Sequence, residues 1–346
     1  MAEKQGTPLE QVGGLRSGLA EALRPYWITT VEELVTAAFE EKARNGLADV
    51  LRIAKGEIDA LGRERLPQVL PAVRERIRVP PEAKATGALD TLDRTLPRDR
   101  SRTLEVLPPR ASLADKMPAI RNQGPRGTCV AHACTALREY LTGDRAIDLS
   151  EQYLYWAARQ KLITPILKDR PGLLLAYGMA ALVEHGIPPE DAWPYNPAQL
   201  PGNEDQGPPP AGIEAPARAN RLRKYSGIFP RDTYSLKVQL AHDNPVAVTV
   251  PTFGFWGGAL IDYTGTVRLP FTAEGTRSPL TRLETAHAIC LVGYQDDAAV
   301  PGGGYYIVRN SWGETWAGQC PDGRGYFWLP YAYVERYGLT AFSGSM

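Results

Sequence analysis

The sequence predicts an α+β protein in which helices come first and strands follow. Up to about residue 186, apolar residues recur at helical spacing, as in the run CVAHACTALREY. Further along the chain, PVAVTV, AICLVGY and GYYIVRN are short β-branched and aromatic runs bounded by glycine and proline. Two unlike halves of this kind commonly enclose a ligand groove, so we expect a groove between them.

Residues 1–78 are predicted to form a small all-α domain with balanced charge. Thr30 opens T-V-E-E, a capping box in which Thr30 accepts from the Glu33 amide while Glu33 reaches back, and an apolar stripe follows. The segments TVEEL and LADVLRIA are loosely similar to tandem helix-hairpin-helix modules, which bind nucleic acid or proteins. The neutral charge and the lack of a G-x-G hairpin argue against nucleic acid. A module that recognises a protein partner, a pro-segment and an inert structural cap remain open.

Residues 79–107 are predicted to be a proline-rich linker or strap, because prolines punctuate a polar stretch with little periodicity. Counted as far as Pro118, the strap spans about 40 residues, and at up to roughly 3.3 Å per residue it can reach the groove from either side. Its basic positions are candidate cleavage sites: Arg94, Arg98, Arg100 and Arg102.

The composition argues against a nucleic-acid-binding, membrane-spanning or secreted protein. The 346 residues carry a formal net charge of zero, so no general attraction to nucleic acid or to an anionic membrane is expected. No run approaches the roughly 18 apolar residues of a membrane span, and the N-terminus lacks the features of a secretory signal. A cytoplasmic protein is therefore expected. The four cysteines include no C-x-x-C pair, so they are predicted to be free thiols, with no metal or cofactor.

Cys129 stands where a helix is predicted to begin, directly after a glycine-rich approach in NQGPRGTCVAHAC. A helix N-terminus favours the thiolate, which is the nucleophilic form of cysteine. His287 opens one strand-like run, and Asn310 closes the next, with a glycine-rich turn between them. A hairpin there would place the Asn310 carboxamide against one ring nitrogen of His287. The other ring nitrogen would then serve the thiol.

Two further side chains complete the candidate site. Gln123 supplies a neutral amide donor, which together with the Cys129 backbone N–H could stabilise an oxyanion. Trp312 follows Asn310 closely and could keep water from the histidine–asparagine hydrogen bond.

Five short motifs in chain order resemble the papain-like cysteine peptidases. They are QGPRGTCVA from Gln123, LSEQ from Leu149, WPY from Trp193, HA at His287 and NSWG from Asn310. The resemblance covers roughly residues 108–340 and implies a peptidase domain over 108–346, with a helical half and a β-rich half. It implies that Cys129 is the nucleophile, that His287 is the acid/base, that Asn310 orients the imidazole, and that Gln123 is the oxyanion donor. It also implies that Gly172, Ala286 and Trp312 line the site for a peptide or protein substrate.

The sequence departs from the family pattern at several positions. Arg126 stands where the family commonly has a disulfide cysteine, and Val130 stands where it has a tryptophan. The paired glycine that contacts substrate reads Gly172–Leu173, and Ala286 replaces an aspartate.

Structural interpretations compete with each functional one. Cys129 and His287 could be core residues, Asn310 a turn asparagine and Gln123 a surface amide. His132 is expected to pack in the core, and the spacing of the cysteines does not fit a zinc site. The favoured function is a cysteine endopeptidase, with restraint by the strap or the helical module as an added hypothesis. The alternatives are a transpeptidase that uses the same acyl-enzyme and a peptide-binding protein that does not cut.

Overall fold

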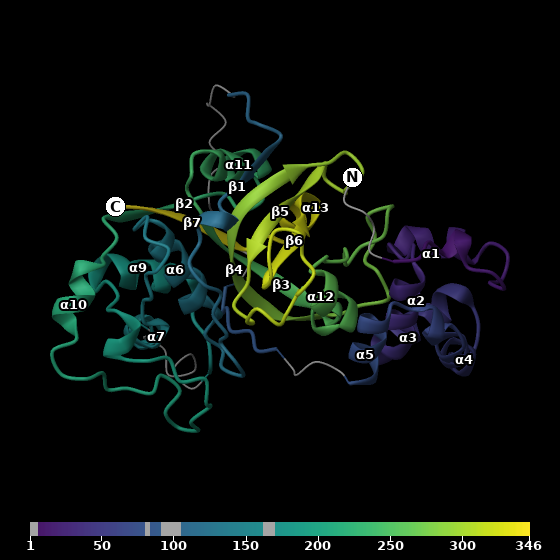
Figure 1. Cartoon of the computed structure of the whole chain (residues 1–346), viewed down its shortest axis with the longest axis horizontal. Helices are drawn as coiled ribbons and strands as arrows, with labels where there is room; N and C mark the ends of the chain where they lie inside the picture. Colours follow the sequence, from purple (N-terminus) through teal and green to yellow (C-terminus); the bar gives the residue numbers. More distant parts are fainter. Residues whose placement is uncertain (1–5, 80–83, 91–104, 162–169) are drawn as a thin grey trace. The chain divides into compact units, whose positions relative to one another are not determined.

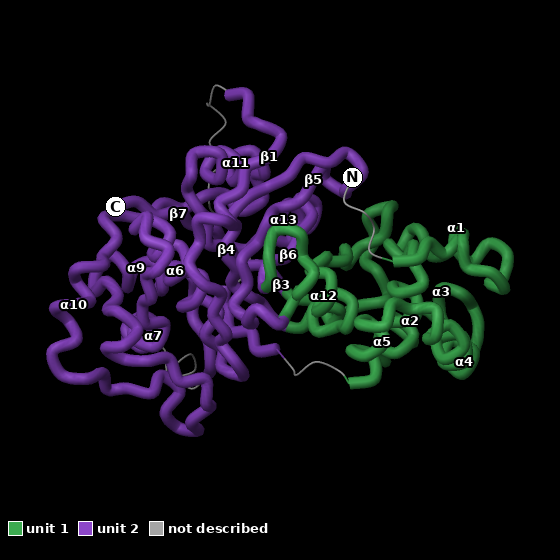
Figure 2. Tube along the Cα trace, in the orientation of Figure 1, with its two compact units in different colours: residues 1–83, 252–284, 316–324 green, residues 84–251, 285–315, 325–346 purple. Residues whose placement is uncertain are grey.

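The computed structural model describes residues 6–79, 84–90, 105–161 and 170–346. The chain divides into two compact units, which Figure 2 colours separately. Unit 1 comprises Met1–Ala83, Thr252–Glu284 and Trp316–Arg324. Unit 2 comprises Lys84–Pro251, Thr285–Thr315 and Gly325–Met346. The basic strap positions proposed as cleavage sites, Arg94, Arg98, Arg100 and Arg102, lie outside the described residues.

Unit 1 is mainly helical (Figure 1). Its α-helices are α1 (Leu19–Leu23), α2 (Val31–Phe39), α3 (Glu41–Leu51), α4 (Lys55–Arg65), α5 (Pro71–Arg78) and α12 (Ala259–Thr264). Its 3-10 turns are η1 (Leu9–Gln11), η2 (Arg24–Tyr26), η3 (Leu66–Gln68) and η6 (Gly254–Gly257). The predicted capping box begins α2, since the Glu33 amide donates to Thr30 Oγ1 at 3.3 Å and Glu33 Oε2 accepts from the Thr30 amide at 3.0 Å.

The segment 252–284 shares one core with these helices, although some 170 residues of chain separate the two. Gly46 of α3 is a point of close approach, because a Cβ there would lie 2.5 Å from the Pro279 carbonyl oxygen. Arg76 of α5 donates to Asp262 of α12 at 2.7 Å. These contacts make the segment part of the helical unit.

Unit 2 contains a helical cluster and a sheet. Its α-helices are α6 (Cys129–Tyr140), α7 (Glu151–Arg159), α9 (Leu175–Glu184), α10 (Glu214–Ala219), α11 (Thr233–Ala241) and α13 (Tyr331–Tyr337), with 3-10 turns η4 (Ala114–Lys116) and η5 (Glu190–Ala192). Helices α6, α7 and α9 pack against one another. Ser150 is the N-cap of α7, because its hydroxyl accepts from the Tyr153 amide at 3.0 Å.

The sheet has seven strands in the order β2-β7-β3-β4-β5-β6, and β1 pairs with β4. The strands are β1 (Arg110–Ser112), β2 (Lys224–Gly227), β3 (Val246–Phe253), β4 (Leu283–Asp296), β5 (Gly304–Arg309), β6 (Tyr326–Pro330) and β7 (Thr340–Ser345). Every residue of β3 and of β5 is buried, which explains why apolar residues dominate these segments.

The predicted α+β class is therefore confirmed, with helices before strands along most of the chain. Strands β4 and β5 form an antiparallel hairpin across the glycine-rich turn. Gly302 and Gly303 both adopt φ +86°, a conformation that favours glycine and lets the chain reverse there. Within the described residues, no helix has the length and apolar character needed to cross a membrane.

Candidate active site

Cys129 is the first residue of α6 and is fully buried. The approach to the helix is tightly packed, because Gly124 adopts φ +60° and a Cβ on it would lie 2.9 Å from Pro197. Tyr195 fixes the same approach: its hydroxyl donates to the Gln123 carbonyl at 2.8 Å and lies 2.7 Å from Thr128 Oγ1. The N-terminus of α6 therefore presents the thiol from a rigid position.

Backbone amides surround the Cys129 sulfur. The Ala288 N–H donates to Sγ at 3.4 Å, and the amides of Gly87 and Val130 also act on the thiolate. These donors lower the pKa of the Cys129 thiol, but burial outweighs them and raises it to about 12. The sequence led us to expect a helix mouth that favours the thiolate. In this structure desolvation outweighs that effect, and the sulfur is protonated.

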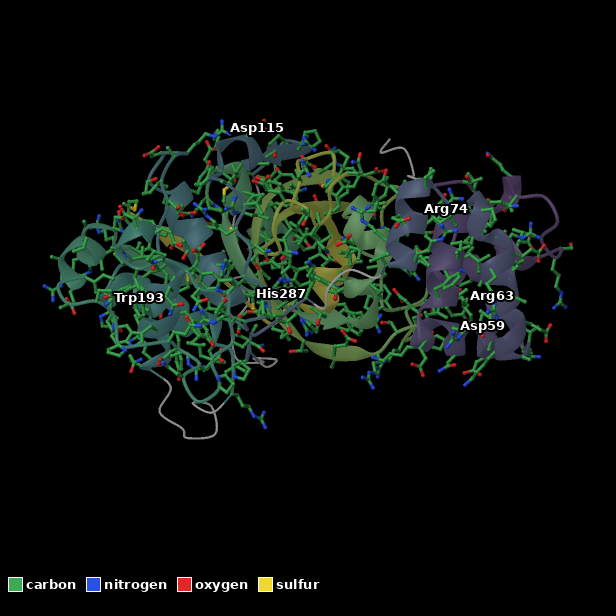
Figure 3. All side chains as sticks on the ribbon, turned by 60° about the horizontal axis from the view of Figure 1, so that its bottom comes forward. Asp59, Arg63, Arg74, Asp115, Trp193 and His287 are labelled. Atoms are coloured by element: carbon green, nitrogen blue, oxygen red, sulfur yellow. The ribbon has the colours of Figure 1, made fainter. Side chains whose placement is uncertain are left out.

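His287 and Asn310 meet as the hairpin predicts, with His287 on β4 (labelled in Figure 3) and Asn310 directly after β5. His287 Nε2 lies 2.9 Å from Asn310 Oδ1. The Ser311 amide donates to the same Oδ1 at 2.9 Å, which holds the carboxamide in place. Trp312 stacks on the imidazole, with ring centroids 4.7 Å apart and planes at 30°. Burial lowers the pKa of His287 to about 4, against the opposing effect of the Asn310 hydrogen bond.

Gln123 is fully buried, so it is not a surface amide. Its Oε1 accepts from Ser311 Oγ at 2.6 Å, so the amide nitrogen points away from Ser311. Nε2 donates to the carbonyls of Arg126 at 2.8 Å and Ala85 at 3.1 Å. Ser311 is a positioning residue that the sequence analysis missed, although it lies inside the NSWG motif.

Residues 84–90 lie along this site, and we call them the covering segment. The Ala88 amide donates to the Ala286 carbonyl at 3.2 Å. The Leu173 amide donates to the Gly87 carbonyl at 2.8 Å, and the Leu89 amide donates to the Leu173 carbonyl at 2.8 Å. The covering segment is therefore bound as an extended strand between two backbone edges of unit 2.

The three residues expected to contact substrate all adjoin this segment. Gly172 adopts φ +115°, and a Cβ on it would lie 2.3 Å from the Gly87 carbonyl oxygen. Ala286 supplies the carbonyl that binds Ala88. Trp312 donates from its indole nitrogen to the Ala85 carbonyl at 3.1 Å.

Gly87 packs tightly against the loop that precedes Cys129. A Cβ on Gly87 would lie 2.1 Å from the Gly127 carbonyl oxygen and 2.6 Å from Gly127 Cα. Real Cβ atoms do not approach backbone so closely, so only glycine permits this packing. The covering segment thus depends on one residue type at one position.

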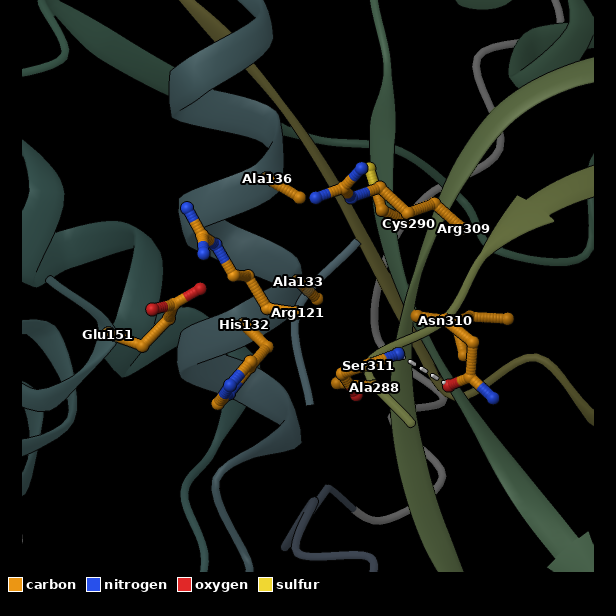
Figure 4. Close-up of a pocket in the computed structure, with 11 residues that line it drawn as sticks. Arg121, His132, Ala133, Ala136, Glu151, Ala288, Cys290, Arg309, Asn310 and Ser311 are labelled. Atoms are coloured by element: carbon orange, nitrogen blue, oxygen red, sulfur yellow. Dashed lines mark hydrogen bonds between the residues drawn. The ribbon is translucent and has the colours of Figure 1, made fainter. Parts of the chain in front are cut away.

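A small cavity lies behind the pair of Asn310 and Ser311 (Figure 4). Its polar lining includes Arg121, His132 and Glu151. His132 packs as the sequence predicts, with Nδ1 3.1 Å from the Thr128 carbonyl oxygen and its ring edge-on to Tyr195. Burial lowers the pKa of His132 to about 3, so it is neutral. This histidine therefore belongs to the core.

The four cysteines are all buried and free. Cys134 packs against Met179, and Cys290 lies within β4. Among the described residues, no group of histidine, cysteine, aspartate or glutamate is arranged to hold a metal ion.

Comparisons with known proteins point to one family. The family described as papain family cysteine protease matches residues 108–340. A probable cysteine protease, RD21B, from Arabidopsis thaliana is 28% identical over 202 residues, which are 57% of this chain and 37% of that protein. The thiol protease SEN102 from Hemerocallis sp. is 24% identical over 201 residues, which are 57% of this chain and 48% of that protein. The chain thus matches less than half the length of these relatives.

Solved structures show the same fold. Xylellain, a cysteine protease from Xylella fastidiosa, superposes with a TM-score of 0.60 at 23% identity, covering 77% of this chain and 98% of that one. Digestive procathepsin L2 proteinase from Tenebrio molitor gives a TM-score of 0.50 at 20% identity, covering 70% of this chain and 69% of that one.

Proposed function

The chain belongs to the papain family of cysteine proteases, and on that premise we propose that it is a cysteine endopeptidase restrained by its own N-terminal region. Cys129 is the nucleophile, His287 transfers protons, Asn310 orients the imidazole and Gln123 stabilises the oxyanion. The observation that carries the proposal is the hydrogen bond between His287 Nε2 and Asn310 Oδ1, at 2.9 Å under Trp312, next to the amide that contacts the Cys129 sulfur.

The proposed reaction has two steps. The Cys129 proton passes to His287, and the sulfur attacks the carbonyl carbon of the scissile peptide bond. Gln123 Nε2 and the Cys129 amide donate to the oxygen as it becomes negative. As the C–N bond breaks, His287 gives its proton to the leaving nitrogen, and a thioester remains. Water then attacks the thioester, loses a proton to His287 and releases the acid, while the sulfur regains its proton.

Asn310 determines which ring nitrogen of His287 transfers protons. It accepts a hydrogen bond from Nε2–H, so Nδ1 is the nitrogen that exchanges protons with sulfur, leaving group and water. Trp312 lies over the imidazole and limits the access of water to this bond. Hydrolysis by this route requires neither metal nor cofactor.

The covering segment supports restraint. Its Ala85 carbonyl accepts from Gln123 Nε2, the donor that would otherwise meet the substrate oxyanion. Its Gly87 presents a backbone N–H to the Cys129 sulfur. With the Gln123 donor engaged and the Gly87 amide against the sulfur, the segment occupies the space that the backbone of a substrate would take.

The test is the substitution Gly87→Val in the full chain. Valine would place its Cβ against the Gly127 backbone, so the covering segment has to leave its present position. We expect kcat/KM on a fluorogenic peptide to rise about tenfold or more, because substrate no longer competes with the segment. Lys84→Ala is the matched control, since Lys84 lies in the same segment but its side chain has no hydrogen bond or ion pair described.

The outcomes separate the proposals. Peptide cleavage that requires Cys129 supports the endopeptidase, and equal activity of Gly87→Val and wild type would reject the restraint. A ligated product with an added amine would favour a transpeptidase. Peptide that binds Gly87→Val but is never cut would favour the non-catalytic alternative.

A further inference from the structure

One of the two backbone edges that bind the covering segment consists of Gly172 and Leu173, and we call it the binding edge. Two side chains of α7, which the sequence analysis did not single out, hold its first residue. The Gly172 amide donates to the Tyr155 hydroxyl oxygen at 3.0 Å, and the Gly172 carbonyl accepts from Arg159 Nη1 at 3.0 Å. Both backbone groups of Gly172 are therefore bonded to side chains of one helix.

Leu173 has the opposite arrangement. Its amide donates to the Gly87 carbonyl at 2.8 Å, and its carbonyl accepts from the Leu89 amide at 2.8 Å. In an extended chain, neighbouring residues direct their N–H and C=O groups to opposite edges, and the contacts here follow that alternation. The hold on Gly172 therefore also sets the direction in which Leu173 presents its two backbone groups.

Tyr155 is fixed both in position and in the direction of its hydrogen bonds. Its hydroxyl donates to Glu204 Oε1 at 2.8 Å, so its one proton is engaged and its lone pairs accept from Gly172. Burial raises the pKa of Tyr155, so the hydroxyl keeps that proton. The ring is fully buried, and the guanidinium carbons of Arg126 and Arg159 lie 5.2 Å and 5.5 Å from its centroid.

Arg159 bonds two backbone carbonyls that precede Leu173. Tyr155 and Arg159 are four residues apart on α7, so they lie on the same face of that helix. Arg159 is buried, and its Nη1 donates to the Arg170 carbonyl at 2.9 Å as well as to the Gly172 carbonyl. The backbone that leads into the binding edge is therefore bonded to α7 at three groups.

Resting on the proposed peptidase function, we propose that Tyr155 and Arg159 are positioning residues for substrate binding, which hold Gly172 so that Leu173 presents its amide and carbonyl to a peptide backbone. All four cysteines are free, so no disulfide shares this task. Both side chains act on the binding edge and not on the nucleophile. Loss of either one should therefore weaken the binding of an extended chain and leave the chemical step unchanged.

The experiment introduces Tyr155→Phe into the full chain carrying Gly87→Val. Phenylalanine keeps the buried ring and removes the oxygen that accepts from the Gly172 amide. We expect KM for a fluorogenic peptide to rise about threefold to tenfold, the equivalent of one hydrogen bond, with kcat unchanged. Arg159→Met should also raise KM, and Arg159→Lys, which keeps a donor, should restore part of the binding.

Two other tyrosines provide matched controls. Tyr153→Phe removes a hydroxyl from the same helix, where the ring packs near Trp156, and it should change neither KM nor kcat. Tyr195→Phe removes the hydroxyl that donates to the Gln123 carbonyl, so it should lower kcat instead of raising KM. These opposite responses distinguish the hold on the binding edge from a general loosening of the site.

A second measurement requires no cleavage. The covering segment binds the same edge through Gly87 and Leu89, so Tyr155→Phe in the chain that keeps Gly87 should speed the labelling of Cys129 by iodoacetamide about threefold to tenfold. Unchanged KM with unchanged labelling, or a fall in kcat alone, would overturn the positioning role. Faster labelling with no cleavage by any variant would support the role of Tyr155 and overturn the proposed peptidase function.

Discussion

Arg126 provides a sharp test of what holds the active-site loop. Its guanidinium is buried and donates from Nη1 to Gln152 Oε1 and the Asn196 carbonyl, both at 2.7 Å, and from Nη2 to the Glu204 carbonyl at 2.9 Å. The cation also lies 5.2 Å from the ring centroids of two tyrosines, Tyr155 and Tyr195. This one side chain connects the loop before Cys129 to α7 and to the 196–204 loop.

The substitution Arg126→Met keeps length and removes the donors. Each hydrogen bond to a charged group is worth about 1.5–3 kcal/mol, and three acceptors would stay buried without a partner. Two effects make the loss smaller than the sum of three bonds. The variant no longer buries a cation, and the energies of the three hydrogen bonds do not add. A net loss of about 3 kcal/mol in the free energy of unfolding is therefore expected. For a domain of 150–250 residues, this loss lowers Tm by about 6–12 °C.

The assay is urea unfolding followed by tryptophan fluorescence, with and without thiol reductant. Arg145→Met is the matched control, because Arg145 is exposed. Arg126→Lys should keep part of the stability, since an ammonium cannot span all three acceptors. Reductant should change none of these values, because the link contains no disulfide. A loss below 1 kcal/mol for Arg126→Met, equal to that of Arg145→Met, would refute the reasoning.

Two further predictions concern the chemistry and the core. In the Gly87→Val chain, Cys129→Ala and His287→Ala should each abolish peptide cleavage, and Asn310→Ala should reduce it less, because Asn310 transfers no proton. Gln123→Ala should lower kcat roughly 10²–10³-fold, and an unchanged kcat would exclude it as oxyanion donor. As the pH falls from 6.5 to 3, the free energy of unfolding should decrease less for His132→Gln than for wild type. Urea unfolding at a series of pH values measures this difference. Burial lowers the pKa of His132 to about 3, so the unfolded chain binds a proton that the folded chain does not, at about 1.4 kcal/mol per pH unit; equal slopes for both chains would contradict this.

The features that the sequence predicts well depend on local geometry. The capping box at Thr30 needs only four consecutive residues, and Ser150 caps its helix in the same local way. The approach of Asn310 to His287 follows from a hairpin, in which strand pairing and a glycine turn set the register. In these cases the separation of two residues along the chain determines their distance in the fold, so the residue pattern alone predicts the contact.

Other features depend on distant backbone contacts that leave little trace in a residue pattern. Gly46 meets Pro279 through backbone atoms, so no side-chain periodicity marks segment 252–284 as part of the helical unit. The covering segment binds largely through main-chain hydrogen bonds, which almost any sequence could make. Gly87 packs against Gly127, and the buried Asp90 accepts from the Leu175 amide at 3.0 Å. In the sequence alone these two residues look like an ordinary linker glycine and a solvated charge.

On the proposed mechanism, displacement of the covering segment and the protonation of Cys129 and His287 form one linked equilibrium. Burial raises the pKa of the Cys129 thiol to about 12 and lowers that of His287 to about 4, so both groups are neutral while they stay buried. A thiolate–imidazolium pair is charged and needs solvent or substrate dipoles around it. Conditions that favour the charged pair therefore weaken the binding of the covering segment. Conditions that favour binding of the segment equally disfavour the charged pair. Because that segment also occupies the Gln123 donor through Ala85, on the proposed mechanism a single displacement frees the nucleophile and the oxyanion donor together.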